Sequence, residues 1–232
     1  MTTAEAGTWL RALAEDGARM SRSSTAERVA DALRARVLDG AIRAGSQLSE
    51  KSLGDALRVS RNTLREAFRL LTHERLLVHE HSRGVFVRVP STEDVADLYA
   101  ARRVIEAGAL RRWPDAPEER RSRVGDAVRW AERLRDDEDW VGVGTANGRF
   151  HAAITALAGS ARLDEEMRRL LAELRLVFQV VGDPEGFHRD YLPRNRAIAD
   201  LLESGELDAA ESALLSYLDT AEEHVTRGLG TL

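Results

Sequence analysis

The stretch from Ser60 to Leu71, SRNTLREAFRLL, decides the fold of the N-terminal part of the chain. Ser60 can cap a helix, because its hydroxyl can accept a hydrogen bond from a backbone amide of the first turn. Apolar residues then recur at steps of three and four: Leu64, Ala67, Phe68 and Leu71. The opposite face carries Arg61, Asn62 and Arg65. The pattern predicts an amphipathic helix that presents arginines to solvent when its apolar stripe is buried.

Two helices are predicted before this one and a hairpin after it. Ser24 and Glu27 have the spacing of a capping box for a helix that ends at Gly40, and Ser49 can cap a second helix through Leu57. Residues 77–80 and 85–88 are β-prone runs joined by residues 81–84, and Pro90 ends this unit. The order helix, helix, helix, hairpin matches a winged helix-turn-helix, whose third helix enters the major groove of DNA.

Composition excludes several classes of protein. The chain of 232 residues has no cysteine, which excludes disulfide scaffolds, cysteine-ligated zinc, iron–sulfur clusters and thiol nucleophiles. Its 5% aromatic and 31% charged residues fit helices with solvated faces better than β-sandwiches. Apolar runs are shorter than the roughly 18 residues of a membrane helix, and the N-terminus lacks a secretory pattern. We therefore expect a soluble, cytoplasmic protein without membrane contact.

Charge differs between the two parts of the chain. Residues 1–90 contain 15 Lys and Arg against 11 Asp and Glu, a net charge of +4, whereas residues 91–232 contain 19 against 28, a net charge of −9. The basic part suits nucleic acid and the acidic part does not.

The polar residues of the helix that begins at Ser60 suit contacts with DNA. Guanidinium groups fit phosphates and the O6/N7 edge of guanine, and Ser60 and Thr63 at a helix N-terminus fit a backbone phosphate. A solvated arginine face is the alternative, which the neighbouring helices and hairpin disfavour.

The part after Pro90 is predicted to be helical throughout. Ser91 and Asp94 can begin a helix that Pro114 ends, and residues 182–186 form the clearest loop. The other predicted helices span residues 118–136, 139–158, 161–181, 189–203 and 206–227. Without a fixed-period repeat, these helices favour a bundle over a solenoid. The predicted fold is therefore mostly α: an N-terminal winged helix-turn-helix followed by an all-α helical-bundle effector domain.

Polar residues interrupt the apolar stripes of four of these helices. The five residues are Arg102, Asn147, His151, Asn195 and Tyr217. Each falls in register with apolar neighbours, so all five should point into the bundle. Burial without partners costs about 1–3 kcal/mol per group. The five groups therefore satisfy one another, hold water, or line a ligand cavity, and the sequence leaves these alternatives open.

The N-terminal unit resembles the DNA-binding domain of the GntR family over residues 24–90. The similarity rests on residues 48–71, above all on Val-Ser-Arg-x-x-Leu-Arg-Glu-Ala at residues 59–67, and on Arg83-Gly-Val-Phe-Val. It implies that Lys51, Arg61 and Arg65 contact DNA directly, with Ser60 and Thr63 on phosphates. It also implies that His81, Ser82 and Arg83 of the wing approach the minor groove. The family usually has glycine where this chain has Arg58 and Arg75, so both residues are expected in the left-handed conformation.

The helical part is similar to the FCD effector-binding domain over about residues 92–228. The similarity rests on residues 102–106, 147–151, 195–198 and 205–210. Many FCD domains bind a divalent metal through one Asp and three His, and the matching positions here are Asn147, His151, Asn195 and Tyr217. Amide oxygens and a phenol are poor ligands for such a metal. We expect no metal and no cofactor, and a ligand site in which Arg102 and these four residues take a small carboxylate or a polar natural product.

Together these features predict a ligand-responsive transcription regulator that binds double-stranded operator DNA as a homodimer and acts as a repressor. The expected domains are a tail at residues 1–23, a winged helix-turn-helix at 24–90 and an FCD-like effector-binding and dimerisation domain at 91–232. The alternatives are an all-α enzyme or a metal-dependent sensor that uses His151, with Glu106 orienting the imidazole. A nucleophile, a phosphate loop and paired inward carboxylates are not recognisable in the sequence, so catalysis is disfavoured. A helical scaffold is the third alternative.

Overall fold

The computed structural model describes residues 24–38 and 40–230, which fall into two compact units. The first unit contains the described residues up to Ile42 and Ser46–Val87, and the second contains Arg43–Gly45 and the described residues from Arg88 onward. The prediction of a tail at residues 1–23 concerns residues outside the described part. The predicted class, a winged helix-turn-helix followed by an all-α bundle, is confirmed.

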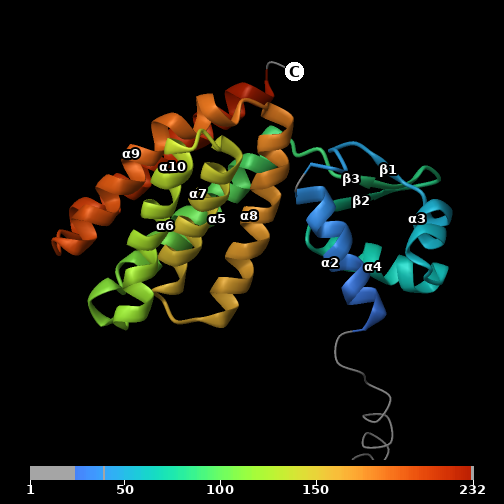
Figure 1. Cartoon of the computed structure of the whole chain (residues 1–232), viewed down its shortest axis with the longest axis horizontal. Coiled ribbons are helices and arrows are strands. Elements are labelled where there is room, and N and C mark those ends of the chain that lie inside the picture. Colours follow the sequence, from blue (N-terminus) through green and yellow to red (C-terminus); the bar gives the residue numbers. More distant parts are fainter. Residues whose placement is uncertain (1–23, 39, 231–232) are drawn as a thin grey trace, which may run out of the picture. The chain divides into compact units, whose positions relative to one another are not determined.

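The first unit contains three helices and a small antiparallel sheet (Figure 1). The helices are α2 (Thr25–Leu38), α3 (Glu50–Leu57) and α4 (Arg61–His73), and the strands are β1 (Gln47–Leu48), β2 (Leu77–Glu80) and β3 (Gly84–Val87). The strand order is β1-β3-β2, with Val78 opposite Phe86 in the predicted hairpin. The sequence did not predict β1, because two residues are too few to show an alternating pattern.

The predicted caps begin the helices of this unit. The Ser24 amide donates to Glu27 Oε2 at 2.6 Å and the Glu27 amide donates to Ser24 Oγ at 3.1 Å, which completes the capping box. The side chain of Ser49 accepts from the Ser52 amide, and that of Ser60 accepts from the Thr63 amide. Both residues expected in the left-handed conformation adopt it, with φ of 53° at Arg58 and 57° at Arg75. The chain therefore makes the turns at both helix ends without glycine.

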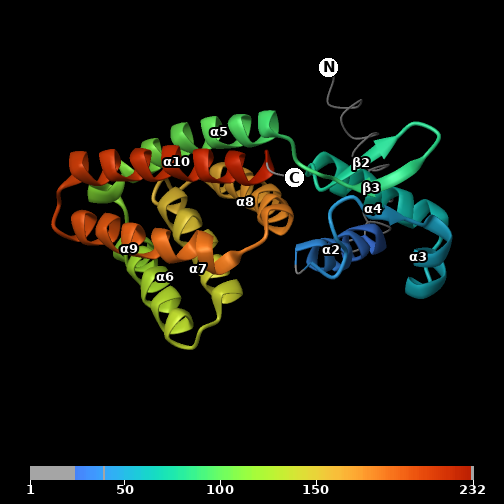
Figure 2. The ribbon, with the colours of Figure 1, turned by 90° about the horizontal axis from the view of Figure 1, so that it is seen from above.

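The second unit is a helical bundle in which α5 and α10 run side by side and α9 lies against α10 (Figure 2). Its elements are α5 (Thr92–Leu110), a 3₁₀ turn (Trp113–Asp115), α6 (Glu118–Asp136), α7 (Trp140–Ala156), α8 (Ala161–Val181), α9 (Pro184–Glu203) and α10 (Leu207–Leu229). One apolar core joins all six helices and includes Tyr99, Phe150 and Leu214. The guanidinium of Arg88, just before α5, contacts Asp94 on α5 and lies 3.4 Å from Glu173 Oε2 on α8.

Two helix boundaries differ from those predicted by three residues or more. Helix α5 ends at Leu110, and the chain forms the 3₁₀ turn around Pro114 instead of continuing to Trp113. Helix α9 begins at Pro184, inside the segment predicted as a loop, because Asp183 caps it and its carboxylate accepts from the Gly186 amide at 2.9 Å. Proline suits the first turn of a helix, where its missing amide hydrogen leaves no bond unmade. The loop between α8 and α9 is therefore limited to Gly182 and Asp183.

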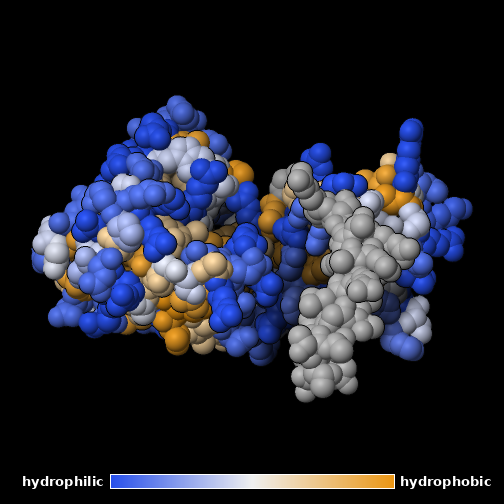
Figure 3. All heavy atoms as spheres, turned by 90° about the horizontal axis from the view of Figure 1, so that it is seen from below, coloured by the Kyte–Doolittle hydropathy of each residue, from blue (hydrophilic) through white to orange (hydrophobic). Residues whose placement is uncertain are grey.

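Within residues 24–38 and 40–230, none of the helices combines the length and the hydropathy that crossing a membrane requires. On the face of the helical unit that Figure 3 shows, hydrophilic side chains cover most of the surface and hydrophobic atoms form patches between them. Apolar atoms make up more than half of the surface of an ordinary folded protein, so such patches alone do not identify a binding site.

Candidate functional site

Helix α4 separates its apolar and its charged residues onto opposite faces. Leu64, Ala67 and Leu71 are fully buried and Phe68 is 3% exposed, whereas Arg61, Asn62, Arg65 and Arg69 are exposed. The buried stripe packs against α2 and α3. A bidentate contact from Arg34 on α2 to Glu74, the C-cap residue just after α4, holds the two helices together at 2.6 Å for each bond. Folding of the unit therefore requires the arginine face of α4 to point outward.

The exposed basic residues of this face differ in their partners. Arg65 donates from Nε to Glu50 Oε1 on α3 at 2.9 Å, and Arg69 donates to Glu66 at 2.8 Å. The side chains of Arg61 on α4 and of Lys51 on α3 have neither a hydrogen bond nor an ion pair with any other described residue. Because exposed ion pairs are weak, a phosphate or a guanine edge can replace Glu50 as the partner of Arg65.

The N-terminus of α4 offers the polar groups that a phosphate requires. Ser60 Oγ accepts from the Thr63 amide at 3.1 Å and lies 2.8 Å from Thr63 Oγ1. The two hydroxyls therefore lie together at the positive end of the helix dipole. Phosphate contacts by Ser60 and Thr63, which the resemblance implies, remain a prediction.

The wing residues lie in the exposed turn between β2 and β3. Ser82 and Gly84 have positive φ, at 61° and 111°, and His81, Ser82 and Arg83 are exposed. Arg83 forms an ion pair with Glu80 and lies over the ring of Phe86, 5.3 Å from its centroid. Gln47 Nε2 donates to the Arg83 carbonyl oxygen at 2.7 Å, which ties the turn to β1. The wing is thus a fixed, exposed loop with one arginine at its tip.

All five polar residues predicted to point into the bundle are buried. Their exposed fractions are at most 7%, and they lie on α5 (Arg102), α7 (Asn147 and His151), α9 (Asn195) and α10 (Tyr217). They form one connected set of contacts together with Glu106, which we call the polar network. The sequence placed Glu106 in this region only as a partner of His151 in the enzyme alternative.

Glu106 joins two of the network's residues. Arg102 Nε donates to Glu106 Oε1 at 2.7 Å, and His151 Nδ1 lies 2.6 Å from Glu106 Oε2. Burial acts to raise the pKa of Glu106, but the charge of Arg102 and contact with His151 outweigh it and hold the pKa below its ordinary value. Burial lowers the pKa of His151 despite the neighbouring carboxylate. The carboxylate is therefore ionised at neutral pH and the imidazole is uncharged.

The other half of the network is built around an amide oxygen. Asn195 Nδ2 donates to Asn147 Oδ1 at 2.6 Å, and the Tyr217 hydroxyl donates to the same oxygen at 3.0 Å. The rings of His151 and Tyr217 lie 5.0 Å apart, which connects the two halves. Burial raises the pKa of Tyr217, so its hydroxyl remains protonated. Three of the network's fully shielded polar atoms have no partner among the described residues: Arg102 Nη2, His151 Nε2 and Asn195 Oδ1.

His188 lies beside this network and was missed by the sequence reasoning. It is 4% exposed, its Nδ1 has no partner among the described residues, and burial lowers its pKa to about 4, with Arg175 adding to the shift. Gly144 on α7 allows this approach, because an added Cβ there would lie 2.5 Å from His188 Nε2. Recognising that α9 begins at Pro184 would have identified His188, because a helix from this residue places His188 in register with Tyr191 and Asn195.

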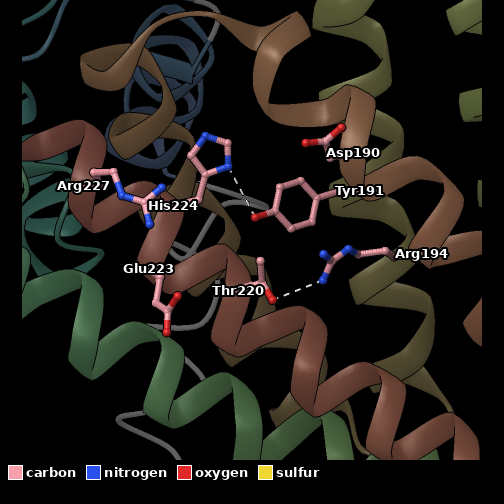
Figure 4. A pocket seen from close by; sticks show the side chains of 7 residues that line it. All are labelled: Asp190, Tyr191, Arg194, Thr220, Glu223, His224 and Arg227. Atoms are coloured by element: carbon pink, nitrogen blue, oxygen red, sulfur yellow. Dashed lines mark hydrogen bonds between the residues drawn. The ribbon is translucent and has the colours of Figure 1, made fainter.

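A surface pocket of about 250 Å³ lies between α9 and α10 and is separate from the predicted ligand residues (Figure 4). At one side Tyr191 Oη lies 3.4 Å from His224 Nδ1, and at the other Arg194 donates to Thr220 Oγ1 at 3.1 Å. Burial raises the pKa of Tyr191 to about 12. None of Arg102, Asn147, His151, Asn195 and Tyr217 lines it.

The outward arginine face, the wing and the helical bundle together define a DNA-binding transcription regulator. The model of the bacterial regulatory proteins of the gntR family matches residues 25–87, and that of the FCD domain matches residues 97–220. The chain belongs to the GntR family and carries an FCD domain, as the sequence motifs indicate.

Relatives and solved structures agree with this assignment. A crystal structure of a GntR transcriptional regulator from Rhodococcus sp. RHA1 is 45% identical, covers 88% of this chain and 98% of its own, and superposes with a TM-score of 0.81. The galactonate operon transcriptional repressor of Escherichia coli K12 is 26% identical over 83% of this chain and 93% of its own length. The gluconate operon transcriptional repressor of Bacillus licheniformis is 36% identical over 93 residues, so the match spans only 40% of this chain and 38% of that repressor.

The residues at the four metal positions of the FCD resemblance do not fit a divalent metal. They supply one imidazole, two amides and a phenol, and the Nδ1 of the imidazole is already bonded to Glu106. The guanidinium of Arg102, bonded to the same carboxylate, would repel a divalent cation. Within the described part of the chain, no group of three or more His, Cys, Asp or Glu side chains is placed to hold a metal. The network therefore offers hydrogen bonds rather than coordination.

Proposed function

We propose that this regulator is a repressor that binds a short palindromic operator as a homodimer. The observation that carries the proposal is the arrangement of α4, where burial of one face leaves Arg61 and Arg65 exposed on the other. Relatives named as operon repressors, such as those for gluconate and galactonate, support the direction of regulation. Because a single winged domain buries little surface on DNA, two recognition helices in adjacent half-sites are needed for useful affinity.

The residues proposed to contact DNA are those of α3, α4 and the wing. Arg61, Asn62 and Arg65 would face base edges, and Lys51, Ser60 and Thr63 would contact the backbone. His81, Ser82 and Arg83 would approach the minor groove. All but Thr63, which is half-buried, are exposed in the structure. We further propose that a small-molecule effector binds the polar network of the FCD domain and changes DNA affinity. The size of that change is limited by the difference between the effector's affinities for the two states of the dimer.

We propose no catalytic role for His151. We also propose that the protein acts in the cytoplasm, because the operator DNA is there. The imidazole is held by Glu106, and the second oxygen of that carboxylate is held by Arg102. This arrangement uses the carboxylate for an internal ion pair and leaves it unavailable to activate a reacting group.

The test is operator binding by paired variants. The operator is first selected from random duplexes, and fluorescence anisotropy then compares wild type with the Arg61→Ala/Arg65→Ala double variant and with Arg28→Ala as a basic-to-neutral control on α2. The double variant should lose about 100-fold or more in preference for the operator over random DNA. The control should keep the preference. Wild-type selectivity in the double variant would refute the proposal, and a monomer in sedimentation experiments with operator would refute the dimer.

A further inference from the structure

The three unpaired atoms of the polar network form an unusual set. Arg102 Nη2, His151 Nε2 and Asn195 Oδ1 are shielded from solvent, come from α5, α7 and α9, and have no hydrogen-bond partner in the described part of the chain. Native proteins pair roughly 90% or more of their buried polar groups. The contacts of Glu106 with Arg102 and His151, and of Asn147 with Asn195 and Tyr217, show that the network is otherwise well bonded. A molecule bound at the network would meet these three shielded atoms.

The hydrogen-bonding role of each atom follows from the bonds its residue already makes. Arg102 Nη2 can only donate. The Glu106 carboxylate can only accept, so the proton of the uncharged His151 ring is on Nδ1, and Nε2 presents a lone pair. Asn195 uses its amide nitrogen toward Asn147 Oδ1, which leaves Oδ1 as an acceptor. The fully shielded, unpaired atoms of the network are therefore one donor and two acceptors.

Charge narrows the class of molecule further. Arg102 is neutralised by Glu106 at 2.7 Å, so the network carries no net positive charge to attract an anion. A carboxylate has acceptors only, so it would face the lone pairs of His151 Nε2 and Asn195 Oδ1 without a proton to share. It would also bring a second buried negative charge close to Glu106, at a large desolvation cost. A hydroxyl group can donate to either acceptor and can also accept from Arg102.

We propose that the effector is an uncharged, hydroxyl-bearing molecule. It donates two hydrogen bonds, to His151 Nε2 and Asn195 Oδ1, and accepts one from Arg102 Nη2. This inference rests on the proposed function, because it specifies the effector of the same site. Of the two ligand classes that the sequence left open, it selects the polar molecule over the carboxylate.

The first experiment uses wild-type protein and pairs of probes. Each pair is a neutral polyol and the sugar acid that differs from it only by a carboxylate at one terminal carbon. Glucitol is compared with gluconate, galactitol with galactonate, xylitol with xylonate and ribitol with ribonate, each at 10 mM in a thermal-shift assay followed by calorimetric titration. At least one neutral polyol should raise the melting temperature, and its partner acid should bind about tenfold more weakly or worse. Shifts caused by the acids alone, or no shift from any polyol, overturn the inference.

The second experiment removes the acceptors one at a time. His151→Phe and Asn195→Leu should each weaken binding of the stabilising polyol about tenfold, whereas His224→Phe, in the surface pocket outside the network, should not change it. Circular dichroism establishes that each variant is folded. Equal binding by the folded Asn195→Leu variant would overturn the inference even if His151→Phe does not fold.

Operator binding by the same preparations distinguishes failure of the proposed ligand class from failure of the proposed DNA-binding function. Wild-type protein that selects its operator but binds only acids, or no probe, contradicts the ligand class and leaves the regulator intact. Operator selectivity of the Arg61→Ala/Arg65→Ala variant tests the proposed DNA-binding function, and it is measured without any ligand.

Discussion

The two units use arginine in the same local geometry and in opposite surroundings. Arg65 lies 2.9 Å from Glu50 with 63% of its side chain exposed, whereas Arg102 lies 2.7 Å from Glu106 with 1% exposed. The distances are nearly equal, so distance does not separate the two pairs. Water screens the exposed pair, so its carboxylate can be exchanged for another anion, whereas the buried pair is fixed because neither ion can return to water. Exposure therefore separates an arginine that is available to a macromolecular partner from one that is held inside a core.

The largest expected effect comes from breaking the buried pair. Glu106→Ala leaves Arg102 charged, buried and without its carboxylate, and should lower the free energy of unfolding by about 3–5 kcal/mol. The matched control is Glu119→Ala, which removes the exposed carboxylate of another pair four residues apart on a helix, that of Glu119 and Arg123. It should cost less than about 0.5 kcal/mol. Urea denaturation measures both, and equal effects would contradict the comparison.

A second effect is expected from pH, because His188 is buried in its uncharged form. Its pKa of about 4 in the folded protein lies below the ordinary value of 6.5, so the unfolded chain binds a proton that the folded chain does not. Stability from this group is complete above pH 6.5 and is lost as pH falls toward 4. Between pH 7.5 and 5 the loss should be about 2 kcal/mol. His151, whose pKa is also lowered by burial, adds a loss in the same direction.

Urea denaturation at several pH values measures this dependence, and His188→Gln is the variant that isolates it. The unfolding free energy of the variant should fall less steeply with decreasing pH than that of wild type, with the slope reduced by the equivalent of up to one bound proton. The exposed His81 provides the control, since His81→Gln removes an imidazole that the fold leaves in solvent. An unchanged slope in His188→Gln would show that another group titrates in this range.

A smaller effect should follow from releasing Arg65. Glu50→Gln removes the carboxylate that holds its Nε and also removes a negative charge from the proposed DNA surface. Operator affinity should rise about three- to tenfold at low salt, and the gain should shrink as salt increases. Anisotropy titrations at several salt concentrations measure it. Glu66→Gln, which releases Arg69 instead, shows how much of any gain comes from charge alone.

The smallest effect concerns the arginines at the two helix ends. Arg58 and Arg75 have positive φ, which costs a side chain about 1 kcal/mol relative to glycine. Arg58→Gly and Arg75→Gly should each stabilise the first unit by up to about 0.5 kcal/mol, because the greater freedom of glycine in the unfolded chain offsets part of the relief. Arg28→Gly, inside α2, should instead destabilise by about 1 kcal/mol. Destabilisation by all three would show that the arginine side chains stabilise these turns.

The sequence predicted most of the first unit, because caps, stripes and a hairpin turn are local features. Ser60, Arg58 and the apolar face of α4 are examples in which three or four neighbouring residues determine the structure. It also predicted that Arg102, His151 and Tyr217 would be buried, since each interrupts an apolar stripe.

It could not predict which of these polar groups bond to one another. The bond from Glu106 to His151 spans 45 residues and the bond from Tyr217 to Asn147 spans 70, so both depend on how the helices pack. Strand β1 and the early start of α9 were missed for a different reason. Two strand residues show no period, and the GDPEG segment resembles a loop although Asp183 and Pro184 are good helix-starting residues.

The two oxygens of Glu106 hold residues of two helices. One holds Arg102 of α5, the helix of Glu106 itself, and the other holds His151 of α7, so a single carboxylate fixes α7 against α5. Only residues 88–91 separate the start of α5 from the last strand of the wing, a span of at most about 14 Å when extended. Arg88, the first residue of this segment, contacts Asp94 of α5 and Glu173 of α8. The segment that follows the wing is therefore held to the helical bundle from its first residue.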